Sequence, residues 1–293
     1  MKTSILGTGL SGMVGTRVVE LLSTEFDFID LSYATGIDIT NYDQVLSKFE
    51  KTSAETVLHM AAKTDVDGCE DEKILGEEGP AWMINVVGTE NIVAAAKKTG
   101  KRVIYISTDF VFNGTKEFYT EEDEPDPINW YSITKYEGEK LVSESGLSFA
   151  IARLAYPYRA VCSLKADFVR RMLEKAKKGE KLFGLTDHVF TPTFIDDIAD
   201  SLRFIFNKKI EGIYHVVGSN SLTPYKAVQQ ILDTFELKAE IIPVKREEFF
   251  KDRAYRPFQL ALKNDKITGF GINLLEFPLG LAEMKRQMEF VNG

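Results

Sequence analysis

A glycine-rich stretch near the start of the chain limits the possible folds more than any other feature. Residues 4–6 form a short apolar strand pattern, residues 7–15 contain four glycines, and a helical pattern of aliphatic residues follows at once. Strand, glycine loop and helix in this order form the dinucleotide-binding layout. Glycine permits a tight turn close to a pyrophosphate, and the helix N-terminus offers free N–H groups to the anion. The alternative is a glycine-rich turn without a ligand. The loop residues that we expect to contact a cofactor are Gly9, Ser11, Gly12, Met13 and Val14.

Strand and helix patterns alternate through the first half of the chain. This alternation predicts an α/β fold with a Rossmann-type, doubly wound parallel sheet, which we place in residues 1–155. The expected strands cover 4–6, 26–31, 56–60, 102–107 and 149–154, and the expected helices after the first cover 41–51, 80–98 and 131–145.

Two strand ends carry residues suited to a dinucleotide. Asp30 lies near the end of the second strand, about 20 residues after the glycines, where a carboxylate can accept hydrogen bonds from a ribose and repel a 2′-phosphate. It therefore favours NAD(H) over NADP(H). The third strand ends in Met60, Ala61 and Ala62, and small residues at this sheet edge suit a flat ligand.

Composition excludes several classes of protein. A net charge of -8 argues against a general nucleic-acid binder, and no apolar run approaches the length of a membrane span. Cys69 and Cys162 are expected to be buried thiols in a reducing compartment, and the cytoplasm is the default location. No His, Cys and carboxylate spacing indicates a metal site. We expect His59 to be a packed strand residue.

Tyr131 and Lys135 form a candidate proton-transfer pair. They are four residues apart, so on a helix they lie on one face. A nearby ammonium group lowers the pKa of a phenol, which makes Tyr-x-x-x-Lys a plausible acid–base device. The fourth strand delivers Thr108 to the same sheet edge, so we expect three groups to meet there.

These features together resemble an extended short-chain dehydrogenase/reductase. Within that superfamily the chain is most similar to the dTDP-4-dehydrorhamnose reductases. The segments that carry the resemblance are 8–15, 38–40, 60–62, 64–70, 85–89, 107–114, 131–139, 191–193 and 256–257.

The resemblance implies a role for each catalytic residue. Thr108 would bond the sugar carbonyl, Tyr131 would donate the proton, and Lys135 would lower the pKa of Tyr131 and hold the nicotinamide ribose. The cofactor would be NADP(H) or NAD(H), contacted also by Tyr131, Lys135, Asp38, Ile39 and Lys63. The reaction would be reduction of the C4 ketone of a nucleotide-linked deoxysugar, as in dTDP-rhamnose and polysaccharide biosynthesis.

The sugar pocket is where this chain differs from the family. Phe110 replaces the usual Tyr, Ser132 replaces a frequent Gly, and Tyr156 lies in the segment where a Trp is common. These differences leave the redox chemistry in place and concern the identity of the sugar. The expected substrate contacts are Val66, Thr108, Asp109, Phe110, Tyr156, Arg253 and Arg256.

The second half is expected to form a smaller α/β substrate-binding domain, residues 156–293, with some segments returning to the first domain. Arg253 and Arg256 are candidates for the diphosphate, because arginine forks match its oxygens; a solvated basic turn is the alternative. His188 is expected to be a surface or hydrogen-bonded residue. The expected helices cover 165–179, 194–206, 225–235 and 279–290, with a strand at 213–217.

Two other functions remain open. The family also contains a regulatory subunit of methionine adenosyltransferase, which binds a partner instead of catalysing; retention of the Thr108, Tyr131 and Lys135 set disfavours it. An epimerase or dehydratase is disfavoured because dehydratases carry an acid pair after the catalytic Ser or Thr, whereas Asp109 here precedes Phe110. The expected partner is a nucleotide-diphosphate sugar, and a homodimer is one possible assembly.

Overall fold

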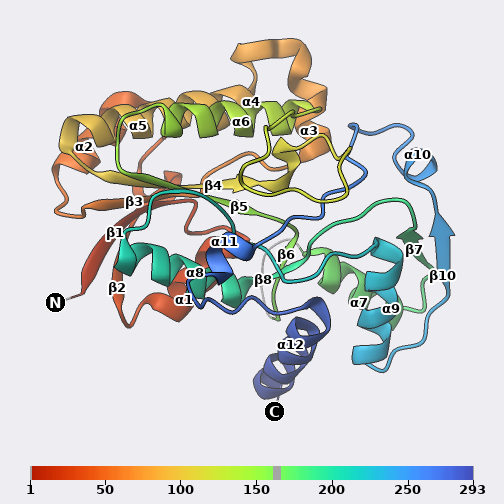
Figure 1. The fold of residues 1–293 in the computed structure, drawn as a ribbon. Helices are drawn as coiled ribbons and strands as arrows, with labels where there is room; N and C mark the ends of the chain where they lie inside the picture. Colours follow the sequence, from red (N-terminus) through yellow and green to blue (C-terminus); the bar gives the residue numbers. More distant parts are fainter. Residues whose placement is uncertain (1, 161–165, 293) are drawn as a thin grey trace.

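One six-stranded parallel sheet organises the molecule (Figure 1). The computed structural model describes residues 2–160 and 166–292. The strand order is β2-β1-β3-β4-β5-β9, and the predicted Rossmann-type sheet is confirmed. The strands are β1 (Thr3–Thr8), β2 (Phe26–Leu31), β3 (Thr56–His59), β4 (Arg102–Thr108), β5 (Phe149–Leu154) and β9 (Gly212–His215).

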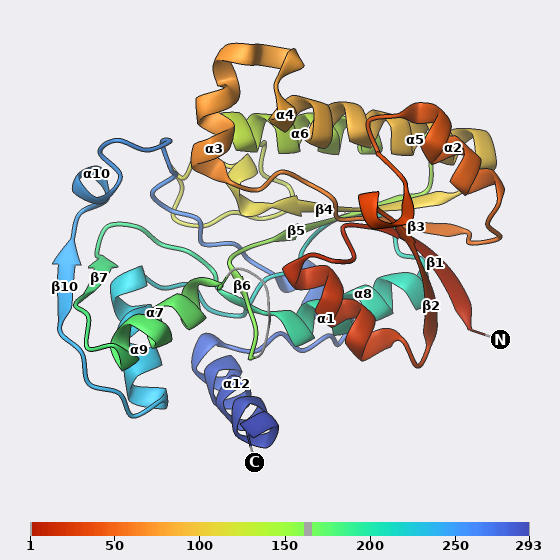
Figure 2. The same ribbon diagram turned by 180° about the vertical axis from the view of Figure 1, so that it is seen from behind.

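Helices cover both faces of this sheet (Figure 2). Successive strand residues point to opposite faces, so Leu6 and Val103 pack under one helical layer while Ile5 and Ile104 pack under the other. The first layer holds α2 (Tyr42–Glu50), α5 (Gly88–Thr99) and α6 (Trp130–Ser143), and the second holds α1 (Met13–Leu22) and α8 (Ile195–Lys208).

The glycine loop lies where the strand order reverses, between β1 and β3. Gly9 has a φ of 67°, and a Cβ at this position would lie 2.7 Å from the backbone nitrogen of Ala61. A Cβ on Gly15 would lie 2.4 Å from the carbonyl oxygen of Gly9. Both contacts are shorter than side chains tolerate, so the fold itself requires these glycines.

The second half forms a smaller lobe and also contributes to the large sheet. In the lobe, β7 (Leu182–Leu185) pairs with β10 (Ile241–Val244), and β6 (Pro157–Tyr158) pairs with β8 (Thr193–Phe194). In contrast, α8 packs on α1 and β9 pairs with β5. The domain boundary at residue 155 stays a prediction. The lobe's helices are α7 (Phe168–Lys177), α9 (Pro224–Thr234) and α12 (Phe277–Asn292).

Several elements differ from the sequence expectation. The expected 80–98 helix consists of α4 (Pro80–Trp82), a π-helical turn (Met83–Val87) and α5. The acidic 63–78 segment, for which a loop or short helix is expected, contains α3 (Val66–Asp71) and a 3₁₀ helix, in agreement with that expectation. Cys69 is a buried free thiol, whereas Cys162 lies outside the described residues. The remaining short elements are α3 (Val66–Asp71), α10 (Arg246–Phe249), α11 (Asp265–Thr268) and 3₁₀ helices at Tyr33–Thr35, Glu72–Glu78 and Asp109–Val111. Within the described part of the chain, no helix is long and apolar enough to cross a bilayer.

Candidate active site

The three predicted catalytic residues occupy the end of β4 and the first turns of α6. Thr108 is the last residue of β4, and its side chain lies beside the phenol of Tyr131, whose pKa it lowers. Lys135 follows Tyr131 by one helical turn, and its Nζ donates to the carbonyl of Ile106 at 2.8 Å. The same ammonium lies 4.1 Å from the ring centroid of Tyr105. Strand β4 therefore orients both side chains of the helix.

The N-terminus of α6 is fixed by a capping box. The Asn129 side chain accepts from the backbone N–H of Ser132 at 2.9 Å, and the Asn129 N–H donates to the Ser132 hydroxyl at 3.1 Å. The Asn129 amide also donates to the carbonyl of Tyr255 at 3.0 Å. Ser132, one of the differences from the family pattern, thus completes the cap of the helix that carries Tyr131.

Burial controls the titration of the catalytic groups. It raises the pKa of Tyr131, and the neighbouring Thr108 side chain lowers it by less. Burial is the largest influence on the pKa of Tyr131 here, and its lowering by Lys135 stays a prediction. Burial also lowers the pKa of Lys135 to about 7, and the negative charge of Glu139 opposes that shift.

Glu139 is a residue whose role the sequence analysis did not assign. It lies one turn beyond Lys135 on α6 and forms a bidentate pair with Arg153, whose Nε and Nη2 lie 2.9 and 2.7 Å from its carboxylate oxygens. Both side chains are almost fully buried. The Lys–Glu spacing of four was visible in the sequence and places the two charges on one helix face.

Asn85 holds the π-helical turn against the active site. Its side-chain oxygen accepts from the backbone N–H of Lys63 at 2.7 Å, and its amide donates to the Lys63 carbonyl and to Thr134 at 3.0 and 2.9 Å. An amide in the middle of a helix competes with the backbone and needs a partner. The structure supplies partners on both the neighbouring loop and α6.

His59 is a packed strand residue, as expected. Its Nδ1 lies 2.7 Å from the Thr8 hydroxyl, which already accepts the N–H groups of Met60 and Ala61. Thr8 therefore donates to Nδ1, and Nε2–H donates to Thr89 at 2.9 Å. Burial lowers the pKa of His59 to about 3, so the ring is neutral and ties β1, β3 and α5 together.

An aromatic wall stands beside Tyr131. The ring centroid of Tyr131 lies 6.1 Å from that of Phe110, and the ring centroid of Phe110 lies 6.4 Å from that of Tyr156. Tyr156 has a φ of 40°, a strained value for a residue with a side chain. Its hydroxyl lies 3.4 Å from Nε2 of His188, which is buried and hydrogen-bonded to the Pro257 carbonyl instead of lying at the surface.

The predicted phosphate-binding arginines meet acidic residues of α3. Arg256 pairs with Asp67 at 2.8 Å, and Asp67 also accepts from the Ala254 N–H at 3.1 Å. Arg253 stacks over Phe249 with its guanidinium 5.6 Å from the ring centroid. Arg246, which the sequence analysis missed, is buried and donates to the Arg256 carbonyl. The turn is built by cation–aromatic contacts, and Arg256 already has a carboxylate partner.

The predicted cofactor residues surround the glycine loop. Gly12 is the N-cap of α1 without a side-chain cap, so the first N–H groups, at Met13 and Val14, face outward from the helix end. Asp30 accepts from the Ser32 hydroxyl at 2.6 Å, while its Oδ1 is buried with no hydrogen-bond partner among the described residues. These observations fit a dinucleotide with its pyrophosphate on the helix and its ribose at Asp30.

Further predicted residues are held by local contacts. The Asp38 N–H donates to Gln44 at 2.8 Å, which fixes the segment before Ile39, and Lys63 pairs with Glu72. Val66 begins α3 beside the aromatic cluster of Phe110 and Tyr131.

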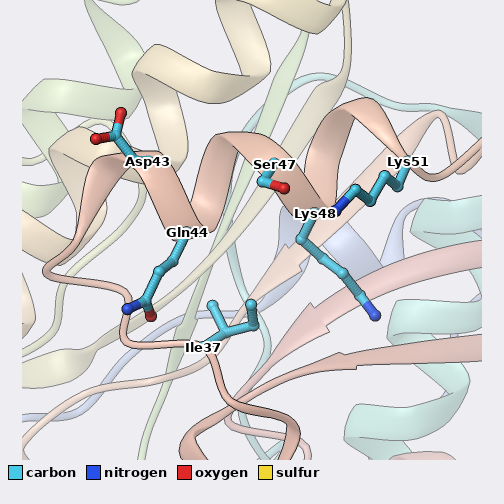
Figure 3. Close-up of a pocket in the computed structure, with 6 residues that line it drawn as sticks. All are labelled: Ile37, Asp43, Gln44, Ser47, Lys48 and Lys51. Carbon is cyan, nitrogen blue, oxygen red and sulfur yellow. The ribbon is translucent and has the colours of Figure 1, made fainter.

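Two hollows lie outside the catalytic set. Figure 3 shows the first, about 360 Å³, where Gln44 reaches from α2 towards Ile37. The second, about 510 Å³, lies between α3 and residues 251–255 and includes Arg253. Among the described residues, no group of three or more His, Cys, Asp or Glu side chains could hold a metal ion.

The fold and this site are those of the extended short-chain dehydrogenase/reductase class. A model of the RmlD substrate binding domain family matches residues 1–290, so the chain belongs to that family.

Three known proteins illustrate the likeness. The structure of dTDP-4-dehydrorhamnose reductase from Bacillus anthracis str. Ames, in complex with NADP, is 29% identical with a TM-score of 0.89, covering 98% of this chain and 100% of that one. The spore coat polysaccharide biosynthesis protein SpsK of Bacillus subtilis is 29% identical over 92% of each chain. Methionine adenosyltransferase 2 subunit beta of Rattus norvegicus is 28% identical over 95% of this chain and 86% of the relative.

Proposed function

We propose that the protein is an NAD(P)H-dependent reductase of the C4 ketone of a nucleotide-linked deoxysugar. The observation that carries the proposal is the meeting of Thr108, Tyr131 and Lys135 at one sheet edge, beside a glycine loop that a side chain would fill. The NADP complex of the similar reductase supports the cofactor class.

A bound nicotinamide dinucleotide would supply the hydride. Gly9, Gly12 and the start of α1 would hold its pyrophosphate, and Asp30 its ribose. Tyr131 supplies a proton from its phenol oxygen to the oxygen that becomes the alcohol. Thr108 hydrogen-bonds the same oxygen, and Lys135 places positive charge beside the phenolate that remains.

The finer substrate assignment concerns the sugar and its nucleotide. The likeness to a dTDP-4-dehydrorhamnose reductase and to a polysaccharide biosynthesis protein favours a dTDP-linked 4-keto-6-deoxyhexose. In this proposal Phe110 and Tyr156 contact the sugar, and Arg256 meets the diphosphate. To do so, Arg256 must share its guanidinium between the ligand and Asp67.

The test is a direct reduction assay. Purified protein with NADH or NADPH and a dTDP-4-keto-6-deoxyhexose should consume the reduced cofactor. Tyr131→Phe should lower kcat by about 10²-fold or more, because it removes the proton donor and keeps the ring. An unchanged rate in this variant would contradict the mechanism.

A second candidate function is regulatory binding. The similarity to a methionine adenosyltransferase subunit extends over 95% of this chain. A binding role predicts that Tyr131→Phe leaves partner affinity unchanged. Co-purification with a methionine adenosyltransferase catalytic subunit, together with absence of turnover on every nucleotide sugar tested, would favour this alternative over the reductase.

A further inference from the structure

A buried acid follows Thr108 directly. Asp109 is only 2% exposed, although it begins a 3₁₀ turn at the end of β4. The Thr108 hydroxyl donates to its Oδ1 at 3.0 Å. Its Oδ2 is buried and has no hydrogen-bond partner within residues 2–160 and 166–292. One oxygen of this carboxyl group is thus hydrogen-bonded to Thr108, and the other is available to carry a proton.

Among the described residues, the charge of Asp109 acts on two phenols, and the backbone N–H groups of Asp109 and Phe110 partly oppose the rise of its own pKa. Its charge acts on Tyr131 of α6 and on Tyr156 after β5 and raises the pKa of each, after burial. Arg256 and Arg171 act on Tyr156, but neither contributes to the pKa shift of Asp109. Burial raises the pKa of Asp109 to about 7, so both protonation states are accessible near neutrality.

The single proton of Thr108 links this acid to Tyr131. A threonine hydroxyl donates one hydrogen bond and accepts up to two. When Asp109 is ionised, Thr108 donates to it and accepts from the phenol of Tyr131. When Asp109 is protonated, the order reverses: Asp109 donates to Thr108, and Thr108 donates to Tyr131. The three oxygens thus form a chain along which a proton can pass.

We propose that Asp109 returns the proton to Tyr131 through Thr108 after each reduction. This inference rests on the proposed reductase function and deepens it. Reduction leaves Tyr131 as a phenolate. The Asp109 carboxyl O–H bond then breaks as a new O–H bond forms on Thr108, and the original Thr108 O–H bond breaks as one forms on Tyr131. The carboxylate that remains takes a proton from solvent, and no electrons are transferred.

The proposal changes the role of Asp109 from the one expected from the sequence. It becomes a positioning and proton-relay residue that acts through Thr108, instead of a direct contact to the sugar. It also gives Thr108 a second task, because the hydroxyl that bonds the substrate oxygen is the hydroxyl that passes the proton on.

Kinetic variants of the full-length protein test the relay. Asp109→Asn keeps the shape and the hydrogen bond but cannot pass a proton, so kcat should fall by about tenfold or more while KM changes little. In Asp109→Ala, added formate should restore the rate in proportion to its acid form. Asp126→Asn, an exposed acid bonded to Asn113 at 2.8 Å, is the control and should behave as wild type.

Infrared spectroscopy tests the same chain without turnover. The spectrum of wild type minus that of Asp109→Asn should show a protonated carboxyl band that disappears as pH rises through about 7 and that Tyr131→Phe shifts; Asp197, whose pKa burial also raises to about 7, contributes equally to both spectra and cancels. Absence of substrate reduction by wild type would overturn the proposed function alone, because this band reports the chain directly. A wild-type kcat in folded Asp109→Asn, failure of formate rescue, or absence of the band would each overturn the relay.

Discussion

At the scale of single residues, the charge state of Lys135 is the most sensitive feature of the site. Burial lowers its pKa to about 7 and Glu139 opposes that shift. The ammonium form, which the proposed chemistry needs, is present below this pKa and is lost as pH rises through it. Glu139→Gln removes the opposing charge, so the alkaline limb of kcat/KM should move to lower pH.

The control for this prediction lies on the same helix. Glu137 is partly exposed and pairs with Lys140 at 2.7 Å, so Glu137→Gln should leave the pH profile unchanged. Glu139→Gln should also lower Tm, because Arg153 loses a buried bidentate partner. A Tm loss with an unshifted pH limb would show that Glu139 supports structure alone.

Asp30 sets the expected choice between the two dinucleotides. Its unpartnered buried Oδ1 suits a ribose hydroxyl and opposes a 2′-phosphate. Asp30→Asn should therefore raise the ratio of NADPH to NADH affinity by about tenfold, the factor that roughly 1.4 kcal/mol of charge repulsion represents. Titration of each cofactor measures it, with the exposed Asp27→Asn on the same strand as control. An unchanged ratio would remove Asp30 from the selection of cofactor.

Residue patterns predicted some site features and could not predict others. The spacing of Tyr131 and Lys135 put both on one helix face, and the strand before Thr108 put that residue at the same edge of the sheet. Both predictions succeed because the repeat of a helix or a strand depends only on neighbouring residues in the sequence. The partners of Arg256 and His188 come from distant segments, Asp67 and Pro257. Such pairings depend on how the second half folds back, which no local period encodes.

At the scale of elements, the cap of α6 positions the proposed acid. Asn129→Ala should cost about 1–2 kcal/mol of unfolding free energy, because the side chain no longer accepts from the Ser132 N–H or donates to the Tyr255 carbonyl. It should also lower kcat, since the first turn carries Tyr131. Chemical denaturation and turnover measure the two effects.

The matched control is Thr223, which caps α9 by accepting from the Lys226 N–H at 3.3 Å. Thr223→Ala should lower stability by about 1 kcal/mol and leave kcat unchanged. Equal loss of kcat in both variants would mean that global stability, and not the position of α6, limits turnover.

The π-helical turn shows where element prediction reaches its limit. The apolar spacing of 80–98 predicted a helix, and the chain is helical there. However, a wider turn at Met83–Val87 differs from an α-helix by a single hydrogen-bond step. Tertiary contacts select this π-helical turn, because Asn85 must hydrogen-bond Lys63 and Thr134 at the same time.

At the scale of the whole molecule, Asp197 links the sheet layer to the C-terminal segment. Its Oδ2 accepts from the Leu275 N–H at 2.8 Å. Burial, with Asp200 and Asp196, raises its pKa from 3.8 to about 7. Because the folded pKa exceeds the unfolded one, the folded state binds more protons between about pH 4 and 7, and stability falls as pH rises through this window.

Asp197→Asn keeps an acceptor for Leu275 and cannot ionise. At pH 8 it should therefore be more stable than wild type by about 2–4 kcal/mol, and the difference should vanish near pH 4. Denaturation at both pH values measures this, with Asp233→Asn, an exposed acid of α9 that does not act on the pKa of Asp197, as control. A stability gain independent of pH would contradict the titration of Asp197.

The path of the chain between the two lobes has an evolutionary consequence. After β5 the chain enters the smaller lobe, returns with α8 and β9 to complete the large sheet, and leaves again towards α9 (Figure 1). A gene fragment ending near residue 155 would lack the helix that covers α1 and the strand that protects the edge of β5. Recombination at a single point near residue 155 would therefore exchange part of the large sheet and of its helical cover together with the smaller lobe.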